Sequence, residues 1–355
     1  MRRFPPFRIL AALALLVALS AAAASAAKPA ERLRVAMIFD CGSSDDGGYN
    51  QTCREGVESL LTRFPVYANF VETDGDGEGD FVRTIAEMAE RGYDLIVGVG
   101  VLIAPSIEEA AARYPKTKFA TVDGGSSWPA ENVCSLTFKV EEAAFPAGYL
   151  AAAWAALRDP ADPAVAWIGG MEVASVTAYT EAFAAGVRHY NRAKKAKVRV
   201  FGKYIDSFDD AAKAEAAAGE YLADGVDVVF AAAGAAGNAA VHAAAEAGKW
   251  AIGVDTDQTR TLYRDRGAIL TSCLKRMDRA VMQLVVAAVE GEFWGGSTYE
   301  GRLLNHGVGL APYYAFGEEI PEETKAEVRA IEAALARGEL PLAAPSAVRP
   351  RPEQP

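Results

Sequence analysis

The chain has 355 residues and a hydrophobic fraction of 51%, which suffices for two domains that each bury a core. Its formal net charge is −11. The acidic balance argues against nucleic acid and anionic membrane surfaces as partners, because both would repel the protein. A neutral small ligand is compatible with this charge.

The first 27 residues have the pattern of a secretory signal. Arg2, Arg3 and Arg8 precede an apolar segment that ends in small residues, so we expect cleavage near Ala27 and a periplasmic mature protein. A retained membrane anchor is the alternative, but no flanking charge follows the apolar segment. No cysteine lies near the expected cleavage site, which argues against a lipid-modified N-terminus. Removing the segment takes away three arginines and no acidic residue, so the formal charge becomes −14.

Strands and helices alternate in the first half of the mature chain, which predicts an α/β fold with a parallel sheet. The first strand is short and continuously apolar, as expected when both faces of a parallel sheet are covered. Strands are expected at residues 35–39, 66–72, 93–99, 118–122 and 133–138, with helices from about 49, at 80–91 and at 104–114.

The loop after the first strand is the first candidate ligand site. Its Gly, Ser and Asp residues favour a tight turn and a helix start at the carboxyl edge of a sheet, where open α/β sheets bind ligands. Asp45, Asp46, Tyr49 and Asn50 are the candidates there, and an aromatic ring beside an amide suits a flat, hydrogen-bonding ligand. An ordinary surface loop with a helix cap is the alternative. A later strand ends at Asp123, which is either a ligand contact or a turn residue.

The second half repeats the pattern after a long apolar helix at 143–158. Strands are expected at 165–168, 198–205, 226–232 and 250–254, with helices at 177–190, 211–223 and 238–247. Each strand ends in glycine, aspartate, asparagine or an aromatic residue, and Phe208, Gly234 and Asp255 lie at such ends. Two sheets whose carboxyl edges face each other predict a ligand cleft between two lobes.

The late strand at 268–273, followed by Lys275, indicates that the chain returns to the first lobe. We therefore expect a first lobe of residues 32–138 plus 268–305. The second lobe takes residues 139–267 plus 306–337, with a connecting segment near 308–312 and a helix at 321–337. The remaining residues, 338–355, are rich in proline and alanine and are expected to be disordered.

Four cysteines, Cys41, Cys53, Cys134 and Cys273, fit an oxidising compartment and allow three pairings. A bridge between Cys41 and Cys53 could rigidify the first loop. No metal or cofactor site is expected, because no histidine lies near a cysteine in sequence. The acidic loop near 74–79 is similar to a calcium loop, but Ile85 stands where that loop needs glutamate.

A series of motifs resembles the basic membrane protein family of bacterial solute-binding proteins, which are nucleoside receptors of ABC importers. The matching segments run in order over about residues 33–314 and include DDGGYNQ, YDLIVGVG, YPKTKFATVDG, WIGGMEV, FAAAGAAGN, IGVDTDQ and ILTSCLKR. The resemblance implies a type I periplasmic-binding fold, with two Rossmann-like lobes joined by three hinge crossovers. It also implies a binding protein that delivers a nucleoside, with a purine favoured, to an inner-membrane permease. A monomer is the default expectation for such a freely diffusing receptor.

Residue by residue, the resemblance implies a role for each candidate. Tyr49 falls where the family usually has a phenylalanine that stacks on the base, and Phe208 is the candidate for the opposing stack. Asn50 and either Asp45 or Asp46 would bond to the base edge. Asp123, Asp255 and Lys275 match positions on the ribose side, and Gly234 would let the backbone approach the ligand. The tyrosine and the DDGG segment depart from the family pattern, which leaves the exact ligand open.

Elementary chemistry favours the same ligand. A base stacked on an aromatic ring gains roughly 1–3 kcal/mol, and carboxylates make charge-assisted hydrogen bonds with a vicinal diol. The acidic residues would repel the phosphates of nucleotides. Receptors for a sugar, a flavin or another heterocycle remain the alternatives, with a nucleoside hydrolase behind them. The chain has no nucleophile motif, so we expect no enzyme.

Overall fold

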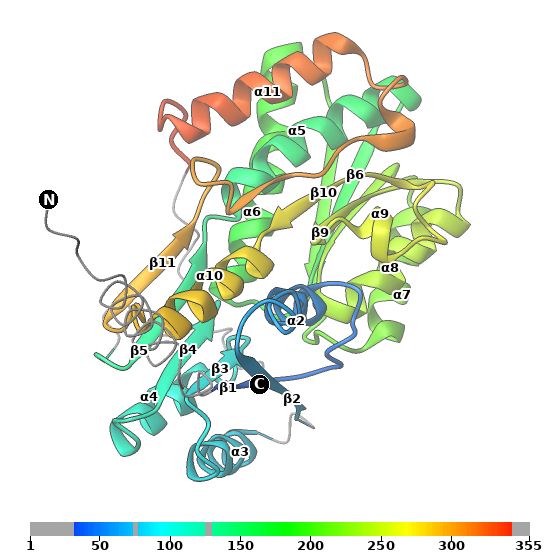
Figure 1. Cartoon of the computed structure of the whole chain (residues 1–355). Helices are drawn as coiled ribbons and strands as arrows, with labels where there is room; N and C mark the ends of the chain where they lie inside the picture. Colours follow the sequence, from blue (N-terminus) through cyan, green and yellow to red (C-terminus); the bar gives the residue numbers. More distant parts are fainter. Residues whose placement is uncertain (1–31, 74–76, 125–129, 343–355) are drawn as a thin grey trace, which may run out of the picture.

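The computed structural model describes residues 32–73, 77–124 and 130–342, which form two α/β lobes, one above the other in Figure 1. The sheet of the first lobe has the order β11-β5-β4-β3-β1-β2 and is parallel throughout. Its strands are β1 (Leu33–Phe39), β2 (Val66–Glu72), β3 (Leu95–Val99), β4 (Lys118–Val122), β5 (Val133–Phe138) and β11 (Ser297–Gly301). The sheet of the second lobe has the order β12-β10-β9-β8-β6-β7, with only β12 antiparallel. Its strands are β6 (Ala164–Gly169), β7 (Arg199–Tyr204), β8 (Val228–Ala232), β9 (Trp250–Asp255), β10 (Ile269–Lys275) and β12 (Val308–Leu310).

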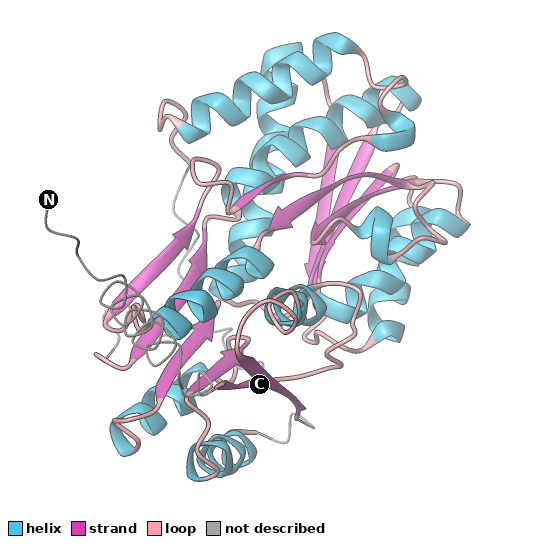
Figure 2. Ribbon diagram, in the orientation of Figure 1, coloured by secondary structure: helices cyan, strands magenta, loops and turns pink. Residues whose placement is uncertain are grey.

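Helices cover both faces of each sheet (Figure 2), which is why the central strands are apolar without alternation. In the first lobe, α2 (Tyr49–Glu58) and α10 (Met277–Glu290) pack on one face, and α3 (Glu78–Glu90) and α4 (Ala104–Arg113) on the other. In the second lobe, α5 (Glu141–Arg158), α6 (Ala174–Lys194) and α11 (Glu322–Ala336) cover one face. The other face carries α7 (Ala211–Ala223) and α8 (Gly234–Glu246), and the short α9 (Gln258–Thr261) and η1 (Tyr314–Phe316) complete this lobe.

Helices α5 and α6 touch backbone to backbone. A Cβ placed on Gly148 would overlap the carbonyl oxygen of Phe183, and one placed on Gly186 would overlap that of Phe145. Two glycines thus face each other across the crossing and let the helices approach more closely than side chains would allow. Helix α5 is buried along most of its length, which explains the long alanine-rich run in the sequence.

The chain passes between the lobes three times, after β5, after β10 and between β11 and β12, which is the number that the family resemblance implies. The crossovers are bonded to one another: the Lys139 amide donates to the Gly301 carbonyl at 2.8 Å, and the Arg276 amide to the Gly307 carbonyl at 2.9 Å. Glu142 of α5 binds the guanidinium of Arg302 in the third crossover, with a shortest distance of 2.6 Å. The hinge is therefore one bonded assembly.

The expected position of the second crossover is wrong. Strand β10 pairs with β9 and β12 in the second sheet, so the chain returns to the first lobe only after Lys275, with α10 and then β11. The apolar pattern of a parallel strand is the same in either sheet and does not indicate which sheet it joins. The sequence also missed β11, a largely exposed edge strand with the polar sequence STYEG.

The structure describes the C-terminal segment as far as residue 342. Leu340 and Leu342 pack against the core of the second lobe, so the expected disorder does not begin at 338. Residues 343–355 lie outside the described part of the chain, as do the signal segment with its cleavage site near Ala27 and residues 74–76 of the acidic loop. Among the described helices, none is both long enough and apolar enough to cross a bilayer.

Candidate ligand-binding site

A cavity lies between the lobes, with an empty volume of about 670 Å³ when the space open to solvent is included. Its walls come mainly from the carboxyl ends of strands and the segments that follow them, where open parallel sheets bind ligands. The first lobe contributes Asp40, Cys41, Gly42, Asp46, Tyr49, Asn50, Gly100, Val101 and Asp123. The second lobe contributes Ser175, Val176, Tyr179, Phe208, Ala232, Gly234, Ala235, Val254, Asp255 and Lys275.

Eight of the nine candidate residues from the sequence line this one cavity. They are Asp46, Tyr49, Asn50, Asp123, Phe208, Gly234, Asp255 and Lys275. The exception is Asp45, whose side chain is 71% exposed and forms a 3.1 Å ion pair with Arg54 of α2. The sequence left the choice between Asp45 and Asp46 open, and the turn places only Asp46 on the cavity side.

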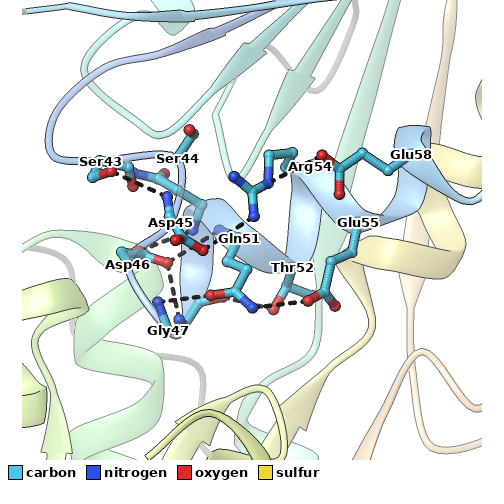
Figure 3. A network of polar contacts seen from close by, with 12 residues as sticks. Ser43, Ser44, Asp45, Asp46, Gly47, Gln51, Thr52, Arg54, Glu55 and Glu58 are labelled. Atoms are coloured by element: carbon cyan, nitrogen blue, oxygen red, sulfur yellow. Dashed lines mark hydrogen bonds and ion pairs between the residues drawn. The ribbon is translucent and has the colours of Figure 1, made fainter.

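The Asp46 carboxylate organises the start of α2 (Figure 3). Its Oδ1 accepts from the backbone amides of Gly48 at 2.9 Å and Gln51 at 3.0 Å, and its Oδ2 from that of Asn50 at 3.0 Å. These bonds satisfy amides that the first turn of a helix leaves unpaired. Asp46 is therefore a helix-capping residue with little remaining capacity to accept from a ligand.

Asn50 fixes the first loop from inside. Its amide nitrogen donates to the carbonyl oxygens of Cys41 at 2.8 Å and Ser43 at 3.1 Å. The side chain is buried, and the nitrogen is committed to the loop. The amide oxygen is the atom of Asn50 that a ligand in the cavity could use.

Two aromatic rings enter the cavity from opposite lobes. Tyr49 belongs to α2, and its hydroxyl donates to the backbone oxygen of Val122 at 3.3 Å. Phe208 follows β7 in the second lobe, and its backbone oxygen accepts from the amide of Ala236 at 2.9 Å. Gly234 has φ +56° and lies against this backbone, so a side chain there would crowd Phe208. Both rings are thus held by backbone contacts at strand ends.

Asp123 and Lys275 form an ion pair across the lobes. Asp123 follows β4 in the first lobe, whereas Lys275 ends β10 in the second lobe and is only 2% exposed. The ammonium lies 5.0 Å from the ring centre of Tyr49 and 5.5 Å from that of Phe138. Burial lowers the pKa of Lys275 to about 7, and the contact with the Asp123 carboxylate acts in the opposite direction by favouring the charged form.

Asp255 ends β9 on the opposite side of the cavity. Its Oδ1 accepts a 3.1 Å hydrogen bond from the hydroxyl of Tyr179 in α6. Burial, with a smaller contribution from the charge of Asp46, raises the pKa of Asp255 to about 7. Asp123 and Asp255 both have left-handed backbone conformations, with φ +63° and +64°. Non-glycine residues rarely adopt this conformation, and it concentrates at functional sites.

The lining side chains that were not predicted from the sequence include Asp40, Cys41 and Tyr179. Asp40 directly follows β1, and its Oδ2 accepts from the Leu102 amide at 2.8 Å. Burial raises the pKa of Asp40 to about 6. Gly100, with φ +110°, packs against this carboxylate and has no room for a side chain. The strand-end rule that selected Asp123 would have found Asp40, whereas Tyr179 lies within a helix and carries no comparable signal.

The lobes also touch directly beside the cavity. The Asn238 amide nitrogen donates to the Asp46 carbonyl at 2.8 Å, and the Thr261 hydroxyl to the Gly47 carbonyl at 2.6 Å. Behind this contact, Gln258 donates to the amide oxygen of Asn238 at 2.9 Å and accepts from the Val254 amide at 3.0 Å. The turn that precedes α2 is thus bonded across the lobes to the end of β9, which is a closed arrangement.

Replacing Thr261 with valine removes one cross-lobe bond while keeping the side-chain shape. We expect the closed state to lose about 1 kcal/mol, because a typical hydrogen bond contributes that much. Small-angle scattering should then show a more open ligand-free protein, and ligand dissociation should accelerate by roughly 3- to 10-fold. Thr259→Val is the matched control, since its hydroxyl bonds to Asp257 within the same lobe. Equal scattering profiles and equal ligand dissociation rates for Thr261→Val and Thr259→Val would contradict the prediction.

All four cysteines are free thiols, so the bridge between Cys41 and Cys53 that the sequence allows is not formed. Cys53 is buried and lies 3.7 Å from the sulfur of Met277, whereas Cys41 lines the cavity. The two side chains enter different parts of the lobe, although both residues flank the same loop. Within the described residues, no three His, Cys, Asp or Glu side chains group closely enough to hold a metal ion.

Two lobes with parallel sheets, three crossovers and a cavity between them define the class of solute-binding proteins. A solved ABC transporter solute-binding protein from Aeropyrum pernix has this fold with a TM-score of 0.82 and 25% sequence identity, over 89% of this chain and 94% of that one. The chain belongs to the family of PnrA-like ABC transporter substrate-binding proteins, whose model matches residues 33–332. Both the fold class and the family expected from the sequence are confirmed.

Curated relatives match over most of their length. A "CD4+ T-cell-stimulating antigen" of Listeria monocytogenes is 30% identical over 88% of each chain. The "ABC transporter nucleoside-binding protein BmpA" of Lactococcus lactis is 29% identical over 78% of this chain and 81% of its own. The family and the Aeropyrum pernix neighbour are solute-binding proteins and not enzymes. Members of this class bind a small molecule outside the cytoplasmic membrane and work with a permease.

Proposed function

We propose that this protein captures a nucleoside, with a purine favoured, between its lobes and delivers it to an ABC permease. The observation that carries the proposal is the pairing of groups across the cavity. The first lobe supplies the ring of Tyr49 and the strand-end carboxylate of Asp123, and the second lobe supplies the ring of Phe208 and the strand-end carboxylate of Asp255. Rings suit a planar base, and carboxylates suit the hydroxyls of a ribose. The naming of the lactococcal relative supports the same ligand class.

A ligand that touches both lobes stabilises the closed state, since those contacts exist together only when the cavity is shut. The ion pair between Asp123 of the first lobe and Lys275 of the second lobe also joins the two lobes in the closed state. Four carboxylates line the cavity (Asp40, Asp46, Asp123 and Asp255) against one lysine. This balance disfavours phosphate, so the proposal is for a nucleoside rather than a nucleotide. Export through a cleaved signal, without a lipid anchor, and action as a monomer belong to the same proposal.

Calorimetric titration of the ligand-stripped mature protein tests the proposal. The panel consists of purine and pyrimidine nucleosides, free bases, pentoses, riboflavin and guanosine monophosphate. We expect binding of at least one purine nucleoside and much weaker binding of the nucleotide. Tight binding of ribose alone, with guanosine and adenosine silent, would favour a sugar receptor instead. Hydrolysis of inosine to ribose and base would revive an enzymatic role.

Binding should weaken as the pH falls. The ionised Asp255 carboxylate accepts from ligand hydroxyls, so ligand binding favours the deprotonated form, and the free protein must lose a proton to bind. With a pKa of about 7, protonation should raise the dissociation constant by about 30-fold between pH 8 and pH 5.5 if only the ionised form binds. Calorimetry across this range checks the prediction. Asp255→Asn should bind weakly with a flatter pH profile, and an unchanged slope would assign the titration to another group.

A further inference from the structure

Tyr179 is a buried phenol inside the cavity wall that the ligand contacts proposed above do not use. It belongs to α6, is 4% exposed, and its ring packs edge-on against Phe230 with ring centres 5.9 Å apart. Phe230 in turn stacks on Phe183 at 4.8 Å. These contacts hold the ring in place, so the hydroxyl has a fixed position beside Asp255, to which it donates at 3.1 Å.

The hydrogen bond from Tyr179 uses Oδ1 of Asp255 and does not involve Oδ2. Among the residues that the structure describes, Tyr179 is the one side-chain hydrogen-bond donor to this carboxylate. Because the bond uses Oδ1, the lone pairs of Oδ2 stay available to a donor that enters the cavity. The terminal torsion of an aspartate is otherwise soft, so a fixed donor restricts which way the carboxylate faces.

The two carboxylates proposed to bind the ligand hydroxyls are held by different kinds of group. Asp123 is paired with the buried ammonium of Lys275, whereas Asp255 is held by a neutral phenol. A phenol orients a carboxylate without cancelling its charge. Asp255 therefore keeps a net negative charge when ionised, and hydroxyl donors bond more strongly to such an acceptor than to a neutral one.

We propose that Tyr179 is a positioning residue that orients the Asp255 carboxylate and so makes the cavity selective for ligands with a ribose hydroxyl over their deoxy analogues. The inference rests on the proposed nucleoside-binding function. It predicts that the tyrosine hydroxyl acts through Asp255 and not through general packing, since phenylalanine at 179 keeps the ring and its contacts.

The test measures how Tyr179→Phe changes discrimination rather than affinity alone. Guanosine, adenosine and their 2′-deoxy and 3′-deoxy analogues are titrated into the wild type and the variant. We expect the wild type to prefer a ribonucleoside at least tenfold over one deoxy analogue, and the variant to reduce this preference at least threefold. Tyr204→Phe is the matched control, because its hydroxyl bonds to Thr180 of the same helix at 3.0 Å outside the cavity lining. Equal weakening of both ligands by Tyr179→Phe, or no change, would overturn the proposal.

A second measurement needs no ligand. Carboxyl carbon resonances of labelled aspartate, assigned with Asp255→Asn, give the titration of Asp255 in the ligand-free protein. Loss of a donor to the ionised form should raise the pKa of Asp255 in Tyr179→Phe. The other titratable groups that face Asp255 remain in the variant; they are Asp46, Tyr49, Cys53 and Cys273.

The two measurements separate the possible failures. An unchanged titration of Asp255 in Tyr179→Phe shows that the hydroxyl does not orient the carboxylate, whatever the ligand. A wild type that binds no nucleoside in the series refutes the proposed function and, with it, the selectivity for ribose hydroxyls. Nucleoside binding with unchanged discrimination refutes the inference alone.

Discussion

Replacing Asp255 with asparagine should weaken guanosine or adenosine binding by more than tenfold while leaving the fold intact. The amide keeps the size of the carboxylate but loses its charge, so bonds to ligand hydroxyls fall to neutral strength and one acceptor becomes a donor. Asparagine also tolerates the left-handed backbone conformation that Asp255 adopts at φ +64°, whereas alanine would add strain. Calorimetry gives the affinity, and urea denaturation checks the fold.

Asp206→Asn provides a matched control for this substitution. Asp206 follows β7, has φ +55° and does not line the cavity, so the same chemical change occurs in the same backbone conformation. Affinity within twofold of the wild type is expected for Asp206→Asn. The same result for Asp255→Asn would mean that the strand-end carboxylate of the second lobe does not hold the ligand.

Asp123→Asn should weaken binding by a similar factor but should also lower stability. The substitution leaves the ammonium of Lys275 buried without its partner carboxylate, and breaking a buried pair in this way commonly costs about 3–5 kcal/mol. Asp255 has no cationic partner of this kind among the described residues, so its variant isolates the ligand contact. Comparing urea midpoints of the two variants separates binding from folding.

Replacing Gly148 with alanine should destabilise the second lobe by about 3 kcal/mol, at the upper end of the cost of overpacking. The new Cβ would overlap the carbonyl oxygen of Phe183, which belongs to the backbone of α6 and cannot rotate away. The two helices would have to separate, and contacts along the whole crossing would loosen. Gly186→Ala should behave alike, because its Cβ would overlap the carbonyl oxygen of Phe145. Urea denaturation of the ligand-free protein measures the effect.

Gly219→Ala is the control for a glycine inside a helix. Gly219 lies on the exposed side of α7, and a Cβ there would meet no atom within 4 Å. Alanine should stabilise the protein by about 0.5–1 kcal/mol, because it has the higher helix propensity. Neutral substitutions typically change the free energy of unfolding by less than about 0.5 kcal/mol. A change this small for Gly148→Ala would contradict the close crossing of α5 and α6.

The side chains at the strand ends could be predicted from the sequence, whereas the contacts between distant segments could not. Asp123 and Asp255 could be selected because a carboxylate directly after an apolar strand lies at the ligand edge of a parallel sheet. The same rule applies to Asp40, although Asp40 was not selected as a candidate from the sequence. Tyr179 could not be selected, because a tyrosine in a buried helix is more often a core residue than a functional one.

The sequence by itself determined the alternation of strands and helices, the two-lobed fold and the residue types at the strand ends. These features depend on local periodicity and on chain order, which a single sequence carries. The tertiary structure decided which sheet β10 joins, that Asp46 and not Asp45 faces the cavity, and that Cys41 and Cys53 stay apart. It also decided that Lys275 meets Asp123 from the opposite lobe. Each of these outcomes depends on the packing of segments far apart in the chain or on the exact turn of a loop, for which local sequence patterns contain no distance information.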